Sequence, residues 1–151
     1  MKVKELMTSD VKSCGPDTNL ATAAKIMWEE DCGAIPVTDE RGKVIGVITD
    51  RDICIAAATR ARTEGDIPVQ DVISKSVFSC SPTDDIRSAL ETMKTRQVRR
   101  LPVVDQNGRL AGILSIHDIA LQSRMSKGNE LPPDAVLDTF VAIGSPAVIH
   151  A

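Results

Sequence analysis

Two patterns of apolar residues alternate along the chain, and each predicts its own type of element. Short runs rich in valine and isoleucine predict strands at 11–14, 34–38, 43–49, 77–80, 101–104 and 109–115. Apolar residues at helical spacing predict helices at 19–30, 50–59, 84–96 and 116–125. A short helical lead-in at 3–7 precedes the first strand. This order predicts an α/β fold with helices on one face of a small sheet.

The elements repeat. The stretch Gly46–Ile53 has a second copy at Gly112–Ile119, 66 positions later, and the same offset aligns the chain without a gap from Val3 to Ile53. Such self-similarity is the sign of a duplicated packing unit. We therefore expect one domain at 1–60, a charged linker at 61–68 and a second domain at 69–125. Units this short bury too little apolar surface to be stable alone, so we expect the pair to share one core.

The tail at 126–151 is a separate extension. Its two prolines at 132–133 suit the start of a helix, and Gly144 suits the end. Between them stands one apolar stripe, formed by Val136, Leu137, Phe140, Val141 and Ile143. A stripe this apolar must be covered, either by the chain's own core or by a second copy in a dimer, and the sequence leaves both open.

Each copy of the repeated stretch is a strand that runs directly into a helix. Thr49 and Ser115 end the strands, and Asp52 and Asp118 follow three residues later. A hydroxyl, a carboxylate and free backbone N–H groups converge at such a junction, which suits a ligand with hydroxyls and phosphate. The same residue types also cap helices and favour the helix dipole. The pattern therefore leaves binding and capping open as alternatives.

The order of several short marks, found twice, resembles the CBS domain, a family named after cystathionine β-synthase whose domains almost always occur in pairs. The marks are Met7-Thr8, Pro16, the stretches Ala34–Asp39 and Val98–Asp105, and the two Gly-x-x-Thr/Ser-x-x-Asp motifs. The layout is also similar to small stand-alone CBS-pair proteins of bacteria, including the hypoxic-response type. The resemblance implies a tandem CBS pair of two β-α-β-β-α units with pseudo-twofold symmetry, followed by a short C-terminal helix.

The resemblance also implies a set of nucleotide-binding residues. In CBS pairs the aspartate of the motif typically binds the ribose hydroxyls, the nearby Thr or Ser supports the ribose or the phosphate, and the base lies against the first strand and the hairpin. Asp52 and Asp118 would then bind ribose, beside Thr49 and Ser115. The base slots would involve Val11, Ser13 and Ile35 in the first copy, and Val77, Ser79 and Leu101 in the second.

Four basic residues are candidate phosphate partners: Arg51, His117, Arg99 and Arg100. Arg51 is charged at any cellular pH, whereas a histidine such as His117 is largely neutral near pH 7. Arg99 and Arg100 can compensate for this difference in the second copy. Their alternative role is that of a solvated strand edge.

Composition argues against several other classes of protein. Aromatic residues make up 2% of the chain and the net charge is −3, which disfavours nucleic-acid binding. No stretch approaches the ~18 apolar residues of a membrane span, and the N-terminus lacks the apolar run of a signal peptide, so we expect a cytoplasmic protein. The cysteines lack the spacing of a zinc site and are expected to be buried thiols; they are Cys14, Cys32, Cys54 and Cys80.

The resemblance to CBS pairs implies a regulatory module that senses adenosine-type nucleotides (AMP, ADP or ATP), needs no obligatory cofactor and forms a homodimer. Such a module also implies a regulated protein partner, here an unknown one. A partner-binding or structural dimer with vestigial nucleotide sites is the alternative. An enzyme is not expected, because the chain has no phosphate-binding loop, no metal cluster and no paired carboxylates with a nucleophile.

Overall fold

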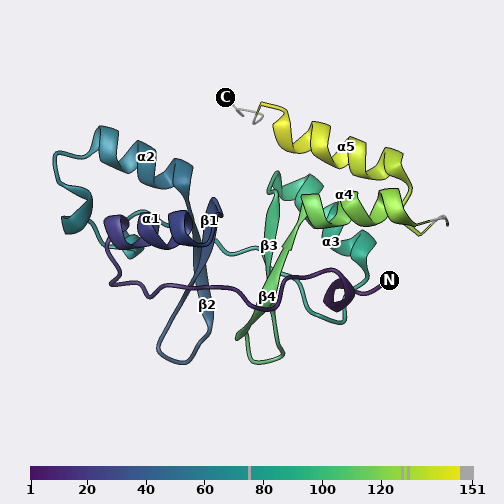
Figure 1. The fold of residues 1–151 in the computed structure, drawn as a ribbon, viewed down its shortest axis with the longest axis horizontal. Coiled ribbons are helices and arrows are strands. Elements are labelled where there is room, and N and C mark those ends of the chain that lie inside the picture. The colour runs from purple at the N-terminus through teal and green to yellow at the C-terminus, as the bar shows by residue number, and fades with distance from the viewer. Residues whose placement is uncertain (75, 127, 129, 147–151) are drawn as a thin grey trace. The chain divides into compact units, whose positions relative to one another are not determined.

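The computed structural model describes residues 1–74, 76–126, 128 and 130–146. Figure 1 shows its elements as a ribbon. The strands are β1 (Ala34–Thr38), β2 (Val44–Thr49), β3 (Arg100–Val104) and β4 (Leu110–Ser115). The helices are α1 (Leu20–Glu29), α2 (Asp50–Thr59), α3 (Ile86–Arg96), α4 (Ile116–Met125) and α5 (Pro133–Gly144), with short 3-10 helices η1 (Val3–Glu5), η2 (Glu64–Asp66) and η3 (Val69–Asp71).

The two repeats have the same order of elements, and the predicted α/β fold class is confirmed. β1 and β2 form one antiparallel two-stranded sheet, and β3 and β4 form another. Each strand pair is a hairpin whose turn contains a glycine with positive φ, Gly42 at 80° and Gly108 at 77°. This conformation is easy for glycine because it has no Cβ.

The predicted first strands at 11–14 and 77–80 are wrong, since each is reduced to one bridging residue. Cys14 pairs with Val37 and Cys80 with Val103, both in parallel. The Cys14 N–H donates to the Pro36 carbonyl at 3.1 Å, and the Thr38 N–H donates to the Cys14 carbonyl at 2.9 Å. The next bond of a parallel ladder would need an N–H from Pro36, which proline lacks. Pro102 stands at the matching place beside Cys80, so the ladder stops there for the same reason.

The chain folds into two compact units that do not follow the repeat order. Of the described residues, one unit contains Met1–Ser9, Phe78–Val103 and those from Ala111 onward, and the other contains those of Asp10–Val77 together with Val104–Leu110. Each unit has its own cluster of buried apolar residues, so the predicted single shared core is not formed as one cluster. The proposed domain boundaries at 1–60 and 69–125 remain a prediction.

The N-terminal lead-in packs on the second repeat. Val3 is fully buried beside Ile86, Leu114 and other residues of that repeat's cluster. Its N–H donates to the Asp84 carbonyl at 3.0 Å. Residues of the first repeat in sequence thus complete the core of the second.

Residues 67–73, which open the second repeat, form a matching lead-in that packs on the first repeat. Ile67 and Val69 are fully buried in the cluster that contains Leu20 and Ile48. The Leu20 N–H donates to the Ile67 carbonyl at 3.0 Å, and the Val69 N–H donates to the Thr18 carbonyl at 2.7 Å. The exchange of lead-ins is therefore reciprocal, which explains how two short repeats each obtain an adequate core.

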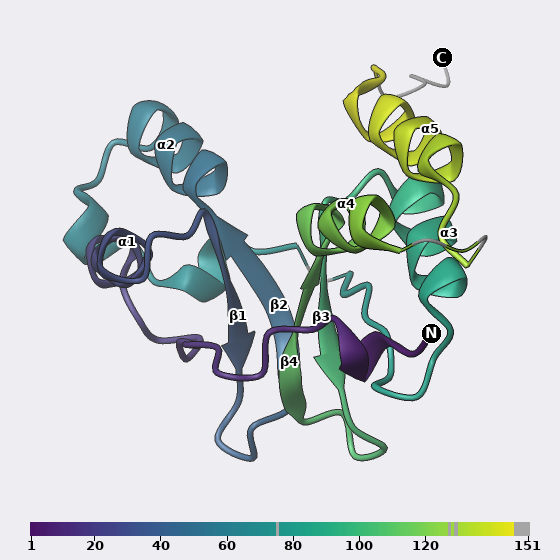
Figure 2. The same cartoon turned by 45° about the vertical axis from the view of Figure 1, so that its right-hand side comes forward.

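The C-terminal helix docks on its own chain. α5 packs against α3 and α4, as the two ribbon views show (Figures 1 and 2). Val136 and Thr139 are buried in this contact, and the Gln97 side chain donates to the carbonyls of Ala142 and Ser145 at the end of α5. The side of α5 that carries Val136 and Thr139 is thus covered by the chain's own core, which is one of the two alternatives that the sequence left open.

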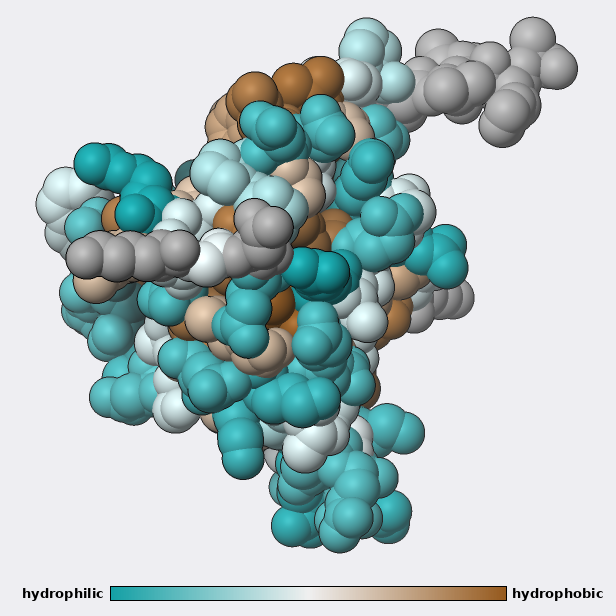
Figure 3. Space-filling model, turned by 90° about the vertical axis from the view of Figure 1, so that its right-hand side faces the viewer, coloured by the Kyte–Doolittle hydropathy of each residue, from teal (hydrophilic) through white to brown (hydrophobic). Residues whose placement is uncertain are grey.

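The rest of the α5 stripe remains uncovered in the single chain. Leu137, Phe140 and Val141 are each 61% exposed. Apolar side chains gather at the top of the molecule in Figure 3, where α5 lies. The helix α5 therefore has apolar residues on two sides, and the single chain buries only one of these sides.

Candidate functional site

The first candidate site is the junction of β2 and α2. The Thr49 hydroxyl accepts a hydrogen bond from the Asp52 N–H at 3.1 Å, and the Asp52 carboxylate accepts one from the Thr49 N–H at 2.9 Å through Oδ2. This reciprocal pair is a capping box, which satisfies two N–H groups of the first helical turn. The capping role that the sequence left open is thus realised.

The second candidate site, at the junction of β4 and α4, has the same construction. The Ser115 N–H donates to Asp118 Oδ2 at 2.9 Å, and the Asp118 N–H donates to Ser115 Oγ at 3.2 Å. The Ser115 hydroxyl also donates to Asp118 Oδ2 at 2.7 Å. The duplication therefore reproduces the arrangement of atoms as well as the order of residues.

Capping leaves part of each carboxylate available. Both caps use Oδ2, and among the described residues neither Asp52 nor Asp118 accepts a hydrogen bond at Oδ1. Both residues are half-buried. An ionised carboxylate oxygen in such a place can accept hydrogen bonds from the hydroxyls of a sugar. Capping and ribose binding are thus compatible in the same residue.

The start of each helix is held by the residue just ahead of the first strand of its hairpin. The Asp50 N–H donates to the Gly33 carbonyl at 3.1 Å, and the Ile116 N–H donates to the Arg99 carbonyl at 2.9 Å. Gly33 and Arg99 are repeat mates, 66 positions apart, just ahead of β1 and β3. The main chain of Arg99 is therefore fixed, while its side chain is exposed.

The two helix starts differ in one N–H group, which the sequence analysis missed. In α2 the Arg51 N–H donates to the Asp50 carboxylate at 2.8 Å. In α4 the residue at the place of Asp50 is Ile116, which is buried and has no acceptor, and the His117 N–H makes no hydrogen bond among the described residues. The expectation of free N–H groups at both junctions is therefore wrong for the first turn of α2. Asp50 could have been recognised from sequence as an acidic residue at the first position of a helix.

The residues proposed to line the base slots have contrasting environments. Ile35 and Leu101 are 1% and 0% exposed, and each lies inside the apolar cluster of its own unit. Ser13 is exposed, and its hydroxyl accepts from the Thr38 hydroxyl at 3.4 Å. Val11 and Val77 are half-buried and Ser79 is exposed. Val77 is the last residue of the segment Asp10–Val77 in one compact unit, whereas Ser79 lies in the segment Phe78–Val103 of the other.

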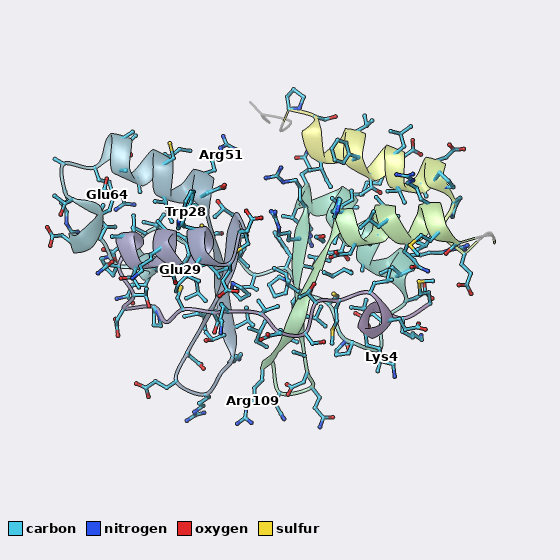
Figure 4. All side chains as sticks on the ribbon, in the orientation of Figure 1. Lys4, Trp28, Glu29, Arg51, Glu64 and Arg109 are labelled. Atoms are coloured by element: carbon cyan, nitrogen blue, oxygen red, sulfur yellow. The ribbon has the colours of Figure 1, made fainter. Side chains whose placement is uncertain are left out.

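The candidate phosphate partners lie at the surface. Arg51 is exposed in the first turn of α2 (Figure 4), and His117 is exposed at the matching place in α4. Arg99 is exposed ahead of β3, and Arg100 is half-buried at its start. None of the ion pairs recorded among the described residues involves these four side chains. The positive charges of the three arginines are therefore available to a ligand.

The cysteines fall into two environments. Burial raises the pKa of the Cys14 thiol to about 11. Burial, with a smaller effect from the Asp84 charge, raises the pKa of the Cys80 thiol to about 12. The expected buried thiols are thus found at Cys14 and Cys80, whereas Cys32 is half-buried and Cys54 is exposed on α2. In the part of the chain that the structure describes, no three His, Cys, Asp or Glu residues gather as metal ligands would.

Comparison with known families identifies the class of protein. The family model of the CBS domain matches residues 3–58 and 69–123. These two matches cover well over half of the chain, so the chain belongs to the CBS domain family and carries a pair of these domains. Both Thr/Ser-x-x-Asp motifs lie inside the matched ranges.

Two curated relatives have nearly the same length as this chain. The CBS domain-containing protein YhcV of Bacillus subtilis (strain 168) is 38% identical over 131 residues, which are 85% of this chain and 91% of that protein. Hypoxic response protein 1 of Mycobacterium tuberculosis (strain CDC 1551 / Oshkosh) is 30% identical over 146 residues, which are 97% of this chain and 96% of that protein. The predicted resemblance to stand-alone CBS-pair proteins of the hypoxic-response type is confirmed.

Two solved structures share the fold. The CBS domain pair of protein MJ0100, in complex with 5′-methylthioadenosine and S-adenosyl-L-methionine, has a TM-score of 0.75 at 24% identity and covers 83% of this chain and 98% of that one. CBSX2 in complex with AMP has a TM-score of 0.70 at 23% identity and covers 82% of this chain and 96% of that one. In the part of this chain that is described, no helix is long and apolar enough to cross a membrane.

Proposed function

We propose that this protein is a regulatory module that binds an adenosine-type ligand at the two strand–helix junctions and does not catalyse a reaction. The observation that carries the proposal is the pair of half-buried aspartates, Asp52 and Asp118, each held by a capping box with one carboxylate oxygen left over. A preorganised acceptor of this kind suits a ribose, because little side-chain entropy is lost when the ligand binds. AMP, ADP and ATP are the ligands that we propose.

The solved relatives support the choice of ligand class. The ligands in the MJ0100 and CBSX2 structures, 5′-methylthioadenosine, S-adenosyl-L-methionine and AMP, all contain adenosine. They differ in what is attached at the 5′ position, which is phosphate in AMP only. The shared part is the ribose and the base, and the ribose is the part that we assign to Asp52 and Asp118.

Calorimetric titration with AMP, ATP and S-adenosylmethionine tests the proposal. Asp52→Asn and Asp118→Asn each keep an oxygen that can accept the capping hydrogen bond while removing the charge. Each substitution should weaken binding at its own site by roughly ten- to a hundred-fold, because a hydrogen bond to a charged acceptor contributes about 1.5–3 kcal/mol. Unchanged affinity in the double variant would show that the aspartates serve only as caps.

The hairpins provide matched controls for this experiment. Asp39 and Asp105 are repeat mates whose Oδ1 atoms accept backbone N–H bonds inside the hairpin turns. Asp39→Asn and Asp105→Asn remove the same charge from the same repeats at a different place. They should leave the affinity for all three ligands unchanged. A loss of affinity in these variants would mean that net charge rather than a specific contact controls binding.

A partner-binding dimer with vestigial nucleotide sites is the second candidate. It is favoured by the exposed apolar residues on helices, among them the repeat mates Ile55 and Leu121, which are 48% and 46% exposed. The neighbouring apolar residues Ala56 and Ile119 on the same helices are core residues of their own units. We propose a homodimer through the exposed helical faces, in the cytoplasm. Sedimentation that shows only monomer at tens of micromolar protein would contradict it.

A further inference from the structure

The glycine that opens each Gly-x-x-Thr/Ser-x-x-Asp motif accommodates a lead-in segment. At Gly112, a Cβ atom would lie 2.6 Å from the Thr8 carbonyl oxygen and 3.1 Å from the Met7 sulfur. At Gly46, a Cβ atom would lie 2.7 Å from the Ile73 Cδ1 atom. Real Cβ atoms do not approach other atoms this closely. At Gly112 the obstacle is a backbone atom, so that place requires the absence of a side chain, whereas at Gly46 the end of the Ile73 side chain would have to move. The motif glycines thus serve packing of the lead-ins, three residues before the hydroxyl of each site.

The chain then continues from each lead-in to the opposite candidate site. Met7 and Thr8 pack on β4, which ends at Ser115 of the second site, and the chain continues within a few residues to Val11 and Ser13, which we assign to the first. Ile73 packs on β2, which ends at Thr49 of the first site. From Ile73 the chain continues to Val77 and Ser79, which we assign to the second site. Each lead-in is thus fixed beside one site and covalently joined to the other.

We infer that these two lead-ins couple the sites, so that an adenosine ligand bound at one site tightens binding at the other. The inference rests on the proposed function. A ligand against Val11 and Ser13 restricts the chain that follows Thr8, and Thr8 is bound to Ile113 of β4 by two backbone hydrogen bonds of 2.9 Å. Binding of the first ligand therefore already orders part of the chain that the second site needs to be ordered. The second ligand loses less conformational entropy when it binds, and this produces positive cooperativity.

The experiment loosens the covalent connection without touching either site. Two glycines are inserted between Ser9 and Asp10, which are both exposed, and two more directly after Ser74, which is exposed and lies three residues ahead of Val77. The same insertion between Ala61 and Arg62, both exposed in the linker, is the matched control. AMP and S-adenosylmethionine are titrated separately into each full-length protein by calorimetry, and the affinity of each single site is taken from Asp52→Asn and Asp118→Asn chains.

In the unmodified chain we expect the second molecule of ligand to bind at least about five-fold more tightly than the first, after correction for the statistical factor of filling two sites. The double insertion should reduce this ratio to one and leave the single-site affinities unchanged, whereas the control insertion should keep the ratio. Two independent sites in the unmodified chain, one ligand per chain, or cooperativity that survives the double insertion would each overturn the coupling. Two independent sites, or cooperativity that survives the double insertion, would leave the proposed function standing, and one ligand per chain would restrict it to one junction. The proposed function fails if neither ligand binds, or if the double variant of Asp52→Asn and Asp118→Asn binds both with unchanged affinity.

Discussion

The backbones of Thr8 and Ile113 bind each other in both directions: the N–H of each donates to the carbonyl of the other at 2.9 Å. Thr8 lies in the first repeat of the sequence, whereas Ile113 lies in β4 of the second. The pairing covers the backbone of β4 on the side away from β3, where an unpaired strand edge would otherwise be exposed. It also places the Thr8 carbonyl directly over Gly112.

Replacing Gly112 should therefore disturb this pairing. In Gly112→Ala the new methyl group meets a backbone oxygen at 2.6 Å, which cannot move without displacing the lead-in. We expect a loss of about 1–3 kcal/mol in the free energy of unfolding, which is typical of overpacking. Gly46→Ala should cost less, because the nearest atom is the end of the Ile73 side chain, which can change rotamer.

Urea unfolding of three variants checks this order. Gly65→Ala is the control, because no atom lies within 4 Å of a Cβ at that glycine. Its free energy of unfolding should be equal to or slightly above that of the unmodified chain. Equal losses in Gly112→Ala and Gly65→Ala would show that the lead-in does not pack against β4 in solution.

The exchange of lead-ins predicts the effects of Val3 and Val69. Both side chains are fully buried, Val3 in the cluster of the second repeat and Val69 in that of the first. Val3→Ala and Val69→Ala should each destabilise the protein by about 1.5–3 kcal/mol, from lost burial and the cavity that remains.

Two measurements separate this prediction from a general loss of stability. Val141→Ala on α5 is the control, since Val141 is 61% exposed and its truncation should change stability by less than about 0.5 kcal/mol. Hydrogen exchange should show that Val3→Ala weakens protection mainly in β4 and α4, and Val69→Ala mainly in β2 and α1. The opposite distribution would mean that each lead-in packs on its own repeat.

The buried thiols predict how stability depends on alkaline pH. The pKa of Cys14 is raised from 9.0 to about 11, and that of Cys80 from 9.0 to about 12. Unfolded thiols therefore lose their protons near pH 9 while the native thiols keep theirs. The contribution of these thiols to stability is fully present below pH 9 and is lost as the pH rises from 9 towards 11 and 12.

Denaturant unfolding between pH 7 and pH 10 measures this dependence. The decline above pH 9 should be smaller in the Cys14→Ala, Cys80→Ala double variant than in the unmodified protein. Cys54→Ala should retain the full decline, because Cys54 is exposed on α2. An identical pH profile in all three proteins would show that the two cysteines are not buried as thiols in solution.

Asp50 predicts a difference in ligand preference between the two sites. Its carboxylate occupies the Arg51 N–H and adds a negative charge at the start of α2, whereas α4 has Ile116 there. A phosphate is therefore less favoured at the first site, since it would meet a like charge and find that N–H already bonded. The ratio of AMP affinity to adenosine affinity should be lower in Asp118→Asn, which retains the first site, than in Asp52→Asn.

Removing Asp50 checks the cause of that difference. Asp50→Ala in the Asp118→Asn chain should raise the ratio, because both the charge and the acceptor disappear. Glu40→Ala, which removes an exposed carboxylate from the first hairpin turn, should leave the ratio unchanged. The explanation through Asp50 is excluded if the two substitutions have the same effect on AMP binding.

Much of the fold follows from local signals in the sequence. The predicted bounds of β1, α2 and α4 agree with Ala34–Thr38, Asp50–Thr59 and Ile116–Met125. Thr49 and Ser115 mark the starts of those helices because they satisfy N–H groups within three residues along the chain. The strands expected at 11–14 and 77–80 fail for a reason outside them, since the prolines that end the ladder belong to β1 and β3.

The pairing of motif residues was also readable from sequence, because Thr49 with Asp52 and Ser115 with Asp118 are close in the chain. The environments of Ile35 and Leu101 were not, since a hydrophobic residue in a short strand can line a slot or fill a core with the same local pattern. The role of Asp50 depends on the hydrogen bond that its carboxylate accepts from the Arg51 N–H. An aspartate at this position could form several other local hydrogen bonds, so the residue type alone does not predict this one.

The sequence by itself determined the two repeats, most of their helices and strands, and the two capped junctions, because each depends on residues a few positions apart. Only the tertiary structure decided which repeat receives each lead-in. Val3 and Val69 occupy the same place in their repeats and have the same side chain, yet each is fully buried in the cluster of the other repeat. Apolar burial is favourable in proportion to the area removed from water, whichever part of the chain supplies the partner. The local pattern thus fixes that these valines are buried, and the path of the whole chain fixes where.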